Sequence, residues 1–174
     1  MHLKKIAFSI LSCSAVFSSL SNAATERLEF QQFTQVEIRN SAQGLCLDPQ
    51  GTSGAKRSDV QLWTCDNTLD QKWYIEPLGT WESIKLGGSF RIKNAASDLC
   101  LDVRGENGSK GENVGIWNCE FNTDQYWRID GNLLINTSKG YVLDPKGKSG
   151  SHGADVVIWD WEKFSDDQYW YTVK

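Results

Sequence analysis

Apolar residues in this chain alternate with polar ones over short segments, and no window shows a convincing 3.6-residue apolar period. Three segments rich in β-branched and aromatic residues are bounded by Gly, Ser, Asn and Asp, which is typical of strands: Val60–Trp63, Val114–Trp117 and Val156–Trp159. A period of two places Val60 and Leu62 on one face of the first strand and Trp63 on the other. The pattern predicts an all-β protein in which Trp63, Trp117 and Trp159 point outward.

One arrangement of residues occurs three times along the chain. Each copy closes with Gln-x-Trp, which begins at Gln71, Gln125 and Gln168. Each copy also contains an Ile-x-Asn or Leu-x-Asn sequence, a Leu-Asp pair and two glycines in the same order and at nearly the same spacing. Agreement at this many positions indicates a repeat architecture, with copies at about residues 34–76, 89–131 and 132–174.

A copy of about 45 residues with about four strands is too small to bury an apolar face alone. The three copies are therefore expected to share one core around a pseudo-threefold axis, which also leaves no exposed sheet edge. Extra residues around 76–88 separate the first two copies and predict a longer loop or hairpin, because they contain Pro77 and two adjacent glycines. The third copy carries one extra residue before Gln168, which is expected to displace the side chains there.

The first 23 residues belong to a different class of segment. Two lysines precede an apolar run that ends in small residues, which predicts a signal peptide at 1–23 and export to the periplasm or the outside of the cell. A lipidated Cys13 is a less favoured alternative, and a membrane span is disfavoured because the run is short and interrupted by serines. Residues 24–33 form a lead-in to the repeats.

The net charge of the chain limits the classes of partner that it is expected to bind. The net charge is −4, and loss of the signal peptide removes two lysines and no acid. This balance argues against nucleic-acid binding, which needs a basic face, and against a polybasic membrane anchor. The eight tryptophans indicate heavy aromatic use in the core, in a binding surface or in both.

Three Gln-x-Trp repeats with Cys-Leu-Asp and Trp-x-Cys at this spacing resemble the ricin B-chain type lectins. The resemblance covers about residues 34–174. It implies a β-trefoil fold and a carbohydrate-binding function.

Four cysteines remain after residue 23, and they occupy equivalent positions in the first two copies. These positions predict the disulfides Cys46–Cys65 and Cys100–Cys119. The third copy has Val142 and Trp161 there, so it has lost both partners together, as a disulfide would require. Zinc ligation is the alternative, although the Cys-x2-Cys spacing that zinc sites favour is absent. Trp161 is expected to fill space against Val142.

The resemblance also implies which residues form each sugar site: the Asp of the Leu-Asp pair, the outer Trp, and the two residues that open Gln-x-Trp. In the family the residue before this Gln is usually Asn, whereas it is Asp in all three copies of this chain. The Asp side chain still accepts hydrogen bonds but lacks the N–H donor of the Asn amide. One further position near each site carries a polar side chain in the first copy alone, where it is Gln61. The equivalent residues in the second and third copies are Gly115 and Val157. The candidate residues are Asp48, Gln61, Trp63, Asp70 and Gln71; Asp102, Trp117, Asp124 and Gln125; and Asp144, Trp159, Asp167 and Gln168.

Each of these residue types also has a structural interpretation. Trp73, Trp127 and Trp170 are expected in the core, around the axis. The three glutamines could brace backbone instead of contacting sugar, and the aspartates could cap turns. His152 is the only histidine after the signal peptide and has no evident catalytic partner. Repeated carboxylates suit repeated binding better than one active centre, so catalysis, a cofactor and a metal site are not expected.

The sequence and its family resemblance thus predict an exported, non-catalytic β-trefoil lectin with up to three sugar sites. Because galactose-type sugars are the common ligands of the family, the resemblance implies a galactose-type ligand. The protein's partners would be glycans or glycoconjugates, and it would act as a free lectin or adhesin or as the binding subunit beside a toxin or enzyme chain. The alternative is a protein-binding trefoil with vestigial sugar sites, docking through the insertion around Trp81. Glycosylation at Asn107 or Asn136 would depend on the host.

Overall fold

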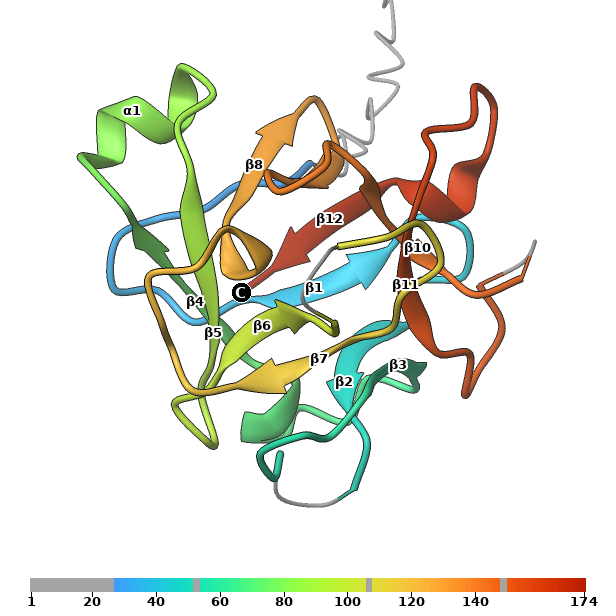
Figure 1. Ribbon diagram of the computed structural model, residues 1–174. Coiled ribbons are helices and arrows are strands. Elements are labelled where there is room, and N and C mark those ends of the chain that lie inside the picture. Colours follow the sequence, from blue (N-terminus) through green and yellow to red (C-terminus); the bar gives the residue numbers. More distant parts are fainter. Residues whose placement is uncertain (1–26, 52–53, 106–107, 148–149) are drawn as a thin grey trace, which may run out of the picture.

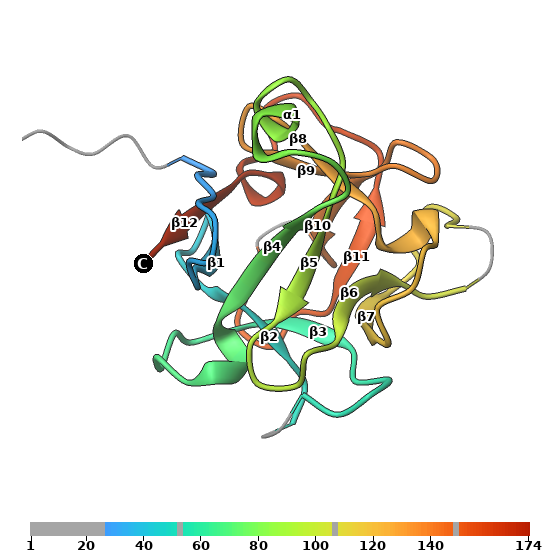
Figure 2. The same ribbon diagram turned by 90° about the vertical axis from the view of Figure 1, so that its left-hand side faces the viewer.

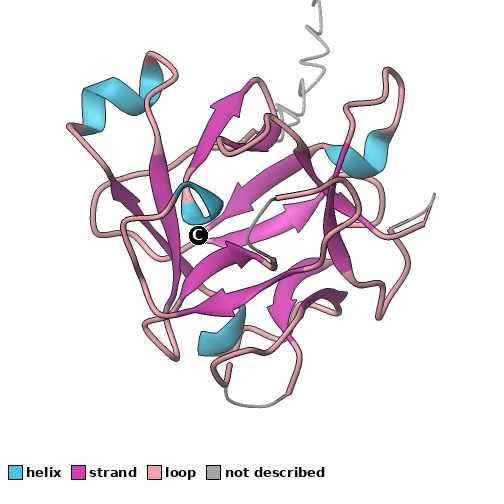
Figure 3. Ribbon diagram, viewed as in Figure 1, coloured by secondary structure: helices cyan, strands magenta, loops and turns pink. Residues whose placement is uncertain are grey.

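Twelve short strands form the framework of the described part of the chain (Figures 1 and 3). The computed structural model describes residues 27–51, 54–105, 108–147 and 150–174. Each repeat contributes four strands, which confirms the all-β prediction and the strand count. They are β1 (Glu37–Asn40), β2 (Cys46–Pro49), β3 (Val60–Trp63) and β4 (Trp73–Pro77); β5 (Phe90–Asn94), β6 (Cys100–Val103), β7 (Val114–Trp117) and β8 (Trp127–Asp130); and β9 (Leu133–Asn136), β10 (Val142–Pro145), β11 (Val156–Trp159) and β12 (Trp170–Val173).

The first and fourth strands of the three repeats join into a closed ring. β4 pairs with β5, β8 with β9, and β12 with β1, all antiparallel, so the last strand lies beside the first (Figure 1). Within each repeat the ring is completed at the buried Trp: Trp73 bridges to Val36, Trp127 pairs with Phe90, and the Trp170 N–H donates to the Asn132 carbonyl at 2.9 Å. The closed ring confirms the expected β-trefoil.

The second and third strands of each repeat form a hairpin that covers one end of this ring. These hairpins are β2–β3, β6–β7 and β10–β11. They touch one another through three equivalent bridges, which join Asp59 to Gly115, Asn113 to Val157, and Asp155 to Gln61. Each bridge links one repeat to the next, and all three lie at the strands that carry the outer tryptophans.

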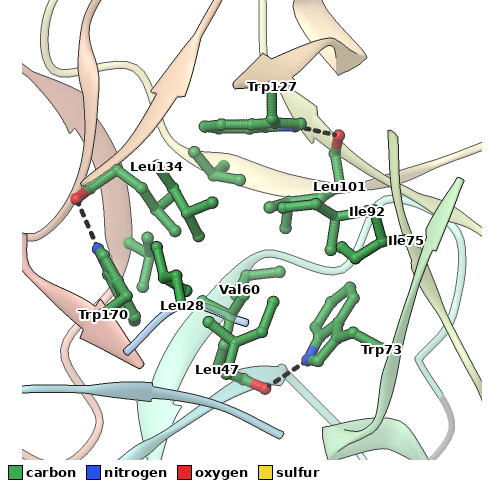
Figure 4. Close-up of a cluster of buried hydrophobic side chains, with 14 of the residues drawn as sticks. Leu28, Leu47, Val60, Trp73, Ile75, Ile92, Leu101, Trp127, Leu134 and Trp170 are labelled. Atoms are coloured by element: carbon green, nitrogen blue, oxygen red, sulfur yellow. Dashed lines mark hydrogen bonds between the residues drawn. The ribbon is translucent and has the colours of Figure 1, made fainter. Parts of the chain in front are cut away.

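The Gln-x-Trp tryptophans fill the core at three corners (Figure 4). Trp73, Trp127 and Trp170 are fully buried, as the sequence predicts. An indole N–H needs an acceptor when it is buried. Each one finds a backbone carbonyl of its own repeat, on Leu47, Leu101 and Leu143 respectively, at 3.0–3.2 Å.

The asparagine of the repeated Ile-x-Asn or Leu-x-Asn sequence links neighbouring repeats. The buried amides of Asn40, Asn94 and Asn136 donate to the backbone carbonyls of Asp167, Asp70 and Asp124 at 2.6–2.9 Å. Each acceptor is the residue before the glutamine of the preceding repeat. Because this use occupies the Asn136 amide in the interior, Asn136 is not an open glycosylation acceptor; Asn107 lies outside the described residues.

Short helices correct the expectation that every copy consists of strands alone. A single 3-10 turn ends at the glutamine of each Gln-x-Trp motif, at Leu69–Gln71, Thr123–Gln125 and Asp166–Gln168. The insertion forms the hairpin β4–β5, with the helix α1 (Trp81–Lys85) at its tip (Figure 2). Thr80 caps this helix by accepting the Ser83 N–H at 3.3 Å. Elements of three to five residues are too short to produce a helical period in the sequence.

The lead-in packs onto the insertion and the ring. Leu28 is buried, and the rings of Phe30 and Phe90 lie 5.5 Å apart. Trp81 is partly buried and packs against the same core. It is therefore less available for docking than the sequence suggests. The signal-peptide prediction for 1–23 and the lipidation alternative at Cys13 fall outside the described residues. Within the described part of the chain, no helix has the length and apolarity to cross a membrane.

Candidate functional sites

Both predicted disulfides are present, Cys46–Cys65 and Cys100–Cys119, with Cα–Cα distances of 5.2 and 5.0 Å. Each disulfide connects the first residue of a hairpin formed by the second and third strands of a repeat to the loop that follows the outer Trp. Among the described residues, one cluster has converging metal-ligand atoms, and it consists of Glu37 with Cys46 and Cys65. Since both thiols form a disulfide, the zinc alternative is wrong for these cysteines.

A carboxylate at the same position in every repeat is held by the glutamine of Gln-x-Trp. Gln71 and Gln125 donate from Nε2 to Oδ2 of Asp48 and Asp102 at 2.8 Å, and Gln168 donates in the same way to Asp144. The Leu-Asp pair lies on the second strand of the repeat and the glutamine on the 3-10 turn. The contact therefore brings together residues 23 or 24 positions apart.

The three glutamines have no free amide donor. The second N–H of each donates to the carbonyl of the residue after the outer Trp, namely Thr64, Asn118 or Asp160, at 2.8–3.0 Å. Each amide oxygen accepts a backbone N–H, from Asp66, Glu120 or Glu162, at 2.7–2.9 Å. All three are buried. The glutamines therefore position the aspartates and the loop, which is the bracing role that the sequence offers as the alternative to direct sugar contact.

The first site has the fullest set of polar groups. Gln61 lies opposite Asp48 on neighbouring strands and donates to its Oδ1 at 3.2 Å. Asp48 thus accepts from two side-chain amides. Trp63 follows two residues after Gln61, on the same face, and is 39% exposed. The outward orientation predicted for this Trp is confirmed.

The second site has no side chain at the Gln61 position, and its neighbours explain why. A Cβ at Gly115 would lie 2.7 Å from the Ser58 carbonyl oxygen and 2.9 Å from Nε of Arg104. The Arg104 guanidinium therefore occupies the space that Gln61 uses in the first site. An open groove of about 630 Å³ runs past this guanidinium, and its lining includes Asp102, Trp117 and Asp124.

The third site keeps its geometry despite the extra residue. Gln168 makes the same bonds as its two counterparts, so the expected displacement does not occur. Val157, at the Gln61 position, is buried. The Trp159 indole N–H donates to Glu162 at 3.2 Å. Trp161 is 53% exposed, which contradicts its expected role as filler of buried space.

The aspartate before each glutamine belongs to the 3-10 turn. Asp70, Asp124 and Asp167 accept side-chain hydrogen bonds from Thr68, Asn122 and Ser165, two residues earlier. Asp124 and Asp167 are buried, whereas Asp70 is partly exposed. These carboxylates stabilise the turn locally, and Asp124 also lines the groove of the second site.

Burial changes the acidity of the three central carboxylates. Desolvation raises the pKa of Asp102 and of Asp144 to about 6, against the lowering effect of the glutamine hydrogen bond. Desolvation also raises the pKa of Asp48, where hydrogen bonds from both Gln71 and Gln61 oppose it. The second amide gives the charged form of Asp48 an additional side-chain hydrogen bond.

Each outer Trp is covered in part by a residue of the preceding repeat, which sequence reasoning missed. Lys56 Nζ lies 3.9 Å from the ring centroid of Trp117, and Lys110 Nζ lies 4.9 Å from that of Trp159. The third equivalent residue is His152, whose ring centroid is 3.9 Å from that of Trp63. All three follow a repeated glycine by two positions, which is the sequence signal that could have identified them.

Backbone hydrogen bonds fix these loops against the next repeat. The residue after each covering side chain donates its N–H to the carbonyl of the residue before the outer Trp. The donors are Arg57, Gly111 and Gly153, and the acceptors are Ile116, Ile158 and Leu62, at 2.7–3.0 Å. Each candidate site is therefore built from two repeats.

Comparison with known proteins agrees with this geometry. The sequence model of the family described as ricin-type beta-trefoil lectin domain matches residues 34–170. The chain belongs to this family. The ricin-type domain is structurally similar to the designed threefold-symmetric protein ThreeFoil, with a TM-score of 0.71, 24% identity, and coverage of 80% of this chain and 98% of that one. It also resembles the hemolytic lectin CEL-III, with a TM-score of 0.63, 30% identity, and coverage of 83% of this chain and 31% of that one.

A shorter similarity involves histidine–tRNA ligases of Coxiella burnetii. Over 77 residues the identity is 27%, and the match covers 44% of this lectin-type chain. The chain thus spans 18% of the length of these curated relatives. The family assignment rests on the match to the ricin-type domain, which extends over all three repeats.

Proposed function

We propose that this protein is an exported lectin that binds galactose-type sugars through up to three sites and has no catalytic activity. The observation that carries the proposal is the threefold pairing of an outward Trp with an Asp carboxylate held by a buried Gln. A sugar ring has apolar C–H faces, which an indole can stack on, and vicinal hydroxyls, which a carboxylate can accept from. A galactose-type ligand is favoured because such sugars are the common ligands of the family.

The carboxylates are prepared to accept hydrogen bonds from a ligand. Their glutamine bonds fix the side-chain orientation before any sugar arrives, which lowers the entropic cost of binding. Within the described residues, Oδ1 of Asp102 and of Asp144 accepts no hydrogen bond from the protein. Each of these two sites therefore offers one free carboxylate oxygen.

Three sites on one rigid body suit a multivalent glycan surface. Individual shallow sites bind weakly, and linkage raises their combined strength through effective concentration. Export is supported by the two disulfides, because such bonds persist in oxidising compartments. A role as a free lectin or adhesin, or as the binding subunit of a toxin, is compatible with the presence of a similar domain in the longer hemolytic lectin CEL-III.

Glycan-array binding and elution from galactose resin test the proposal on the purified exported protein. The triple variant D48N/D102N/D144N keeps side-chain size and removes the three carboxylate charges. The matched control is the triple variant D66N/D98N/D130N, since these three carboxylates are exposed and lie outside the central position of each site. Binding by the parent and the control, with loss in the site variant, supports the proposal. A parent that binds no glycan would overturn it and favour the protein-binding alternative.

A further inference from the structure

The second site carries two cations that no described carboxylate neutralises, and this observation extends the proposed function. We propose that the second site selects sugars bearing an anionic group, a carboxylate or a sulfate, beside the ring that stacks on Trp117. The inference rests on the proposed lectin function and assigns a ligand class to one site.

Two cations lie over Trp117 without an acidic partner. Lys56 Nζ is 3.9 Å and the Arg57 guanidinium carbon 5.0 Å from the ring centroid. In the described part of the chain, neither side chain forms an ion pair with a carboxylate. At the equivalent place in the third site, Lys110 is bound to Asp160 at 2.9 Å. The first site has His152 there, so a free cation pair is particular to the second site.

A third cation, Arg104, lines the same groove next to Arg57. Arg104 fills the space beside Gly115 and pairs with Asp59. Arg57 and Arg104 both line the groove, and the Arg104 guanidinium donates to the Arg57 carbonyl. A ligand in the groove beside Trp117 would therefore meet two guanidinium groups.

Carboxylates also line the groove. Asp102, Glu120 and Asp124 lie with Asn122 on the Gln125 side. Asp102 and Asp124 are engaged by Gln125 and Asn122 respectively. Sugar hydroxyls suit these acceptors, whereas an anionic substituent suits the position beside Trp117 where Lys56 and Arg57 lie. Guanidinium groups recognise carboxylate and sulfate through charge-assisted hydrogen bonds.

The backbone at Arg57 gives a second reason to assign it a role. Its φ is 77°, in the left-handed region, where the other two repeats place Gly111 at 87° and Gly153 at 80°. A side chain costs conformational energy there that glycine avoids. Glycine at this position would keep the hydrogen bond from the backbone N–H to the Ile116 carbonyl, so the fold does not require the guanidinium.

The test isolates the second site in the background D48N/D144N, which disables the other two carboxylates. Titration calorimetry compares methyl galactoside with galacturonic acid and with galactose 6-sulfate. We expect the anionic sugars to bind roughly fivefold more tightly, because each of the two exposed cations adds one weak ion pair with the anionic group. The preference should shrink as salt rises from 20 to 500 mM, since exposed pairs are screened. A response to one anionic sugar alone identifies the group and supports the proposal.

Variants of the cation pair decide the inference. K56Q/R57G should abolish the anionic preference and retain neutral-sugar binding, while K56R should keep the preference. The matched control K85Q/K139Q removes two exposed lysines away from the site and should change nothing. Thermal unfolding verifies that each variant is folded.

Three outcomes overturn the inference while leaving the lectin function intact. The first is equal affinity for neutral and anionic sugars in the isolated second site. The second is an anionic preference that survives K56Q/R57G. The third is no binding in the isolated site when the parent binds galactose. Failure of the parent to bind any sugar instead refutes the proposed function itself.

Discussion

Sugar binding at the second and third sites should weaken as pH falls from 7 to 5. Asp102 and Asp144 have pKa values raised to about 6 by desolvation. If the sugar requires the charged carboxylate, its apparent affinity scales with the fraction ionised. That fraction is about nine-tenths at pH 7 and about one-tenth at pH 5 for a pKa near 6. We therefore expect an approximately tenfold loss of affinity at each of these two sites.

The measurement uses three single-site proteins: D102N/D144N for the first site, D48N/D144N for the second and D48N/D102N for the third. Calorimetric titration with methyl galactoside at pH 7, 6 and 5 gives each affinity. Repeating the pH 6 titration in two buffers of different ionisation enthalpy detects proton release, which binding to a carboxylate of raised pKa must produce.

The first site supplies an internal comparison. Asp48 accepts from both Gln61 and Gln71, so its charged form is better stabilised and its pH response should be smaller. Gln61→Ala in the first-site protein should enlarge that response. Affinities at the second and third sites that stay constant between pH 7 and 5, without proton release, would refute the reasoning.

Three other outcomes follow from the same contacts. Among Asp48→Ala, Asp102→Ala and Asp144→Ala, the first should reduce sugar affinity most, because Gln61 provides one more hydrogen-bonding side chain, worth about 0.5–1.5 kcal/mol; calorimetry showing full affinity in Asp48→Ala and none in either other variant would contradict this ranking. Asp102→Asn should raise the unfolding free energy at pH 7 by on the order of 2 kcal/mol and have little effect at pH 4, because the raised pKa of Asp102 means that its charge destabilises the folded state above pH 6 and that protonation removes this cost. Denaturant titrations at both pH values measure the unfolding free energy, and an equal change at pH 7 and pH 4 would show that the charge is not the cause. Replacing Cys46 and Cys65 by Ser should cost on the order of 3 kcal/mol of stability, the loop-entropy value for a separation of 19 residues, whereas Val142→Ala/Trp161→Ala, at the same positions of the third repeat, should cost no loop entropy; hydrogen exchange localises the loss, and protection unchanged in the first repeat would argue against the expected effect.

Much of the fold follows from the repeat. Trp73, Trp127 and Trp170 could be assigned to the core because three equivalent positions of one apolar type must share a single interior. Cys46–Cys65 could be paired because its positions recur as Cys100–Cys119 and disappear together in the third copy. The outward direction of Trp63 followed from strand alternation alone. All three inferences use positions within one repeat, where spacing along the chain sets spacing in space.

The contacts between repeats depended on the tertiary structure. Nothing in the spacing of Asn94 showed that its amide would meet the Asp70 carbonyl, or that Lys56 would lie over Trp117, because the relative placement of two repeats is set by the closure of the ring. The burial of Gln71, with every amide group bonded, likewise depends on a loop folding back onto the Leu-Asp strand. The sequence by itself determined the three copies, their strands and their core. Packing of one copy against the next decided which side chains surround each candidate sugar, because each site is formed where two repeats meet.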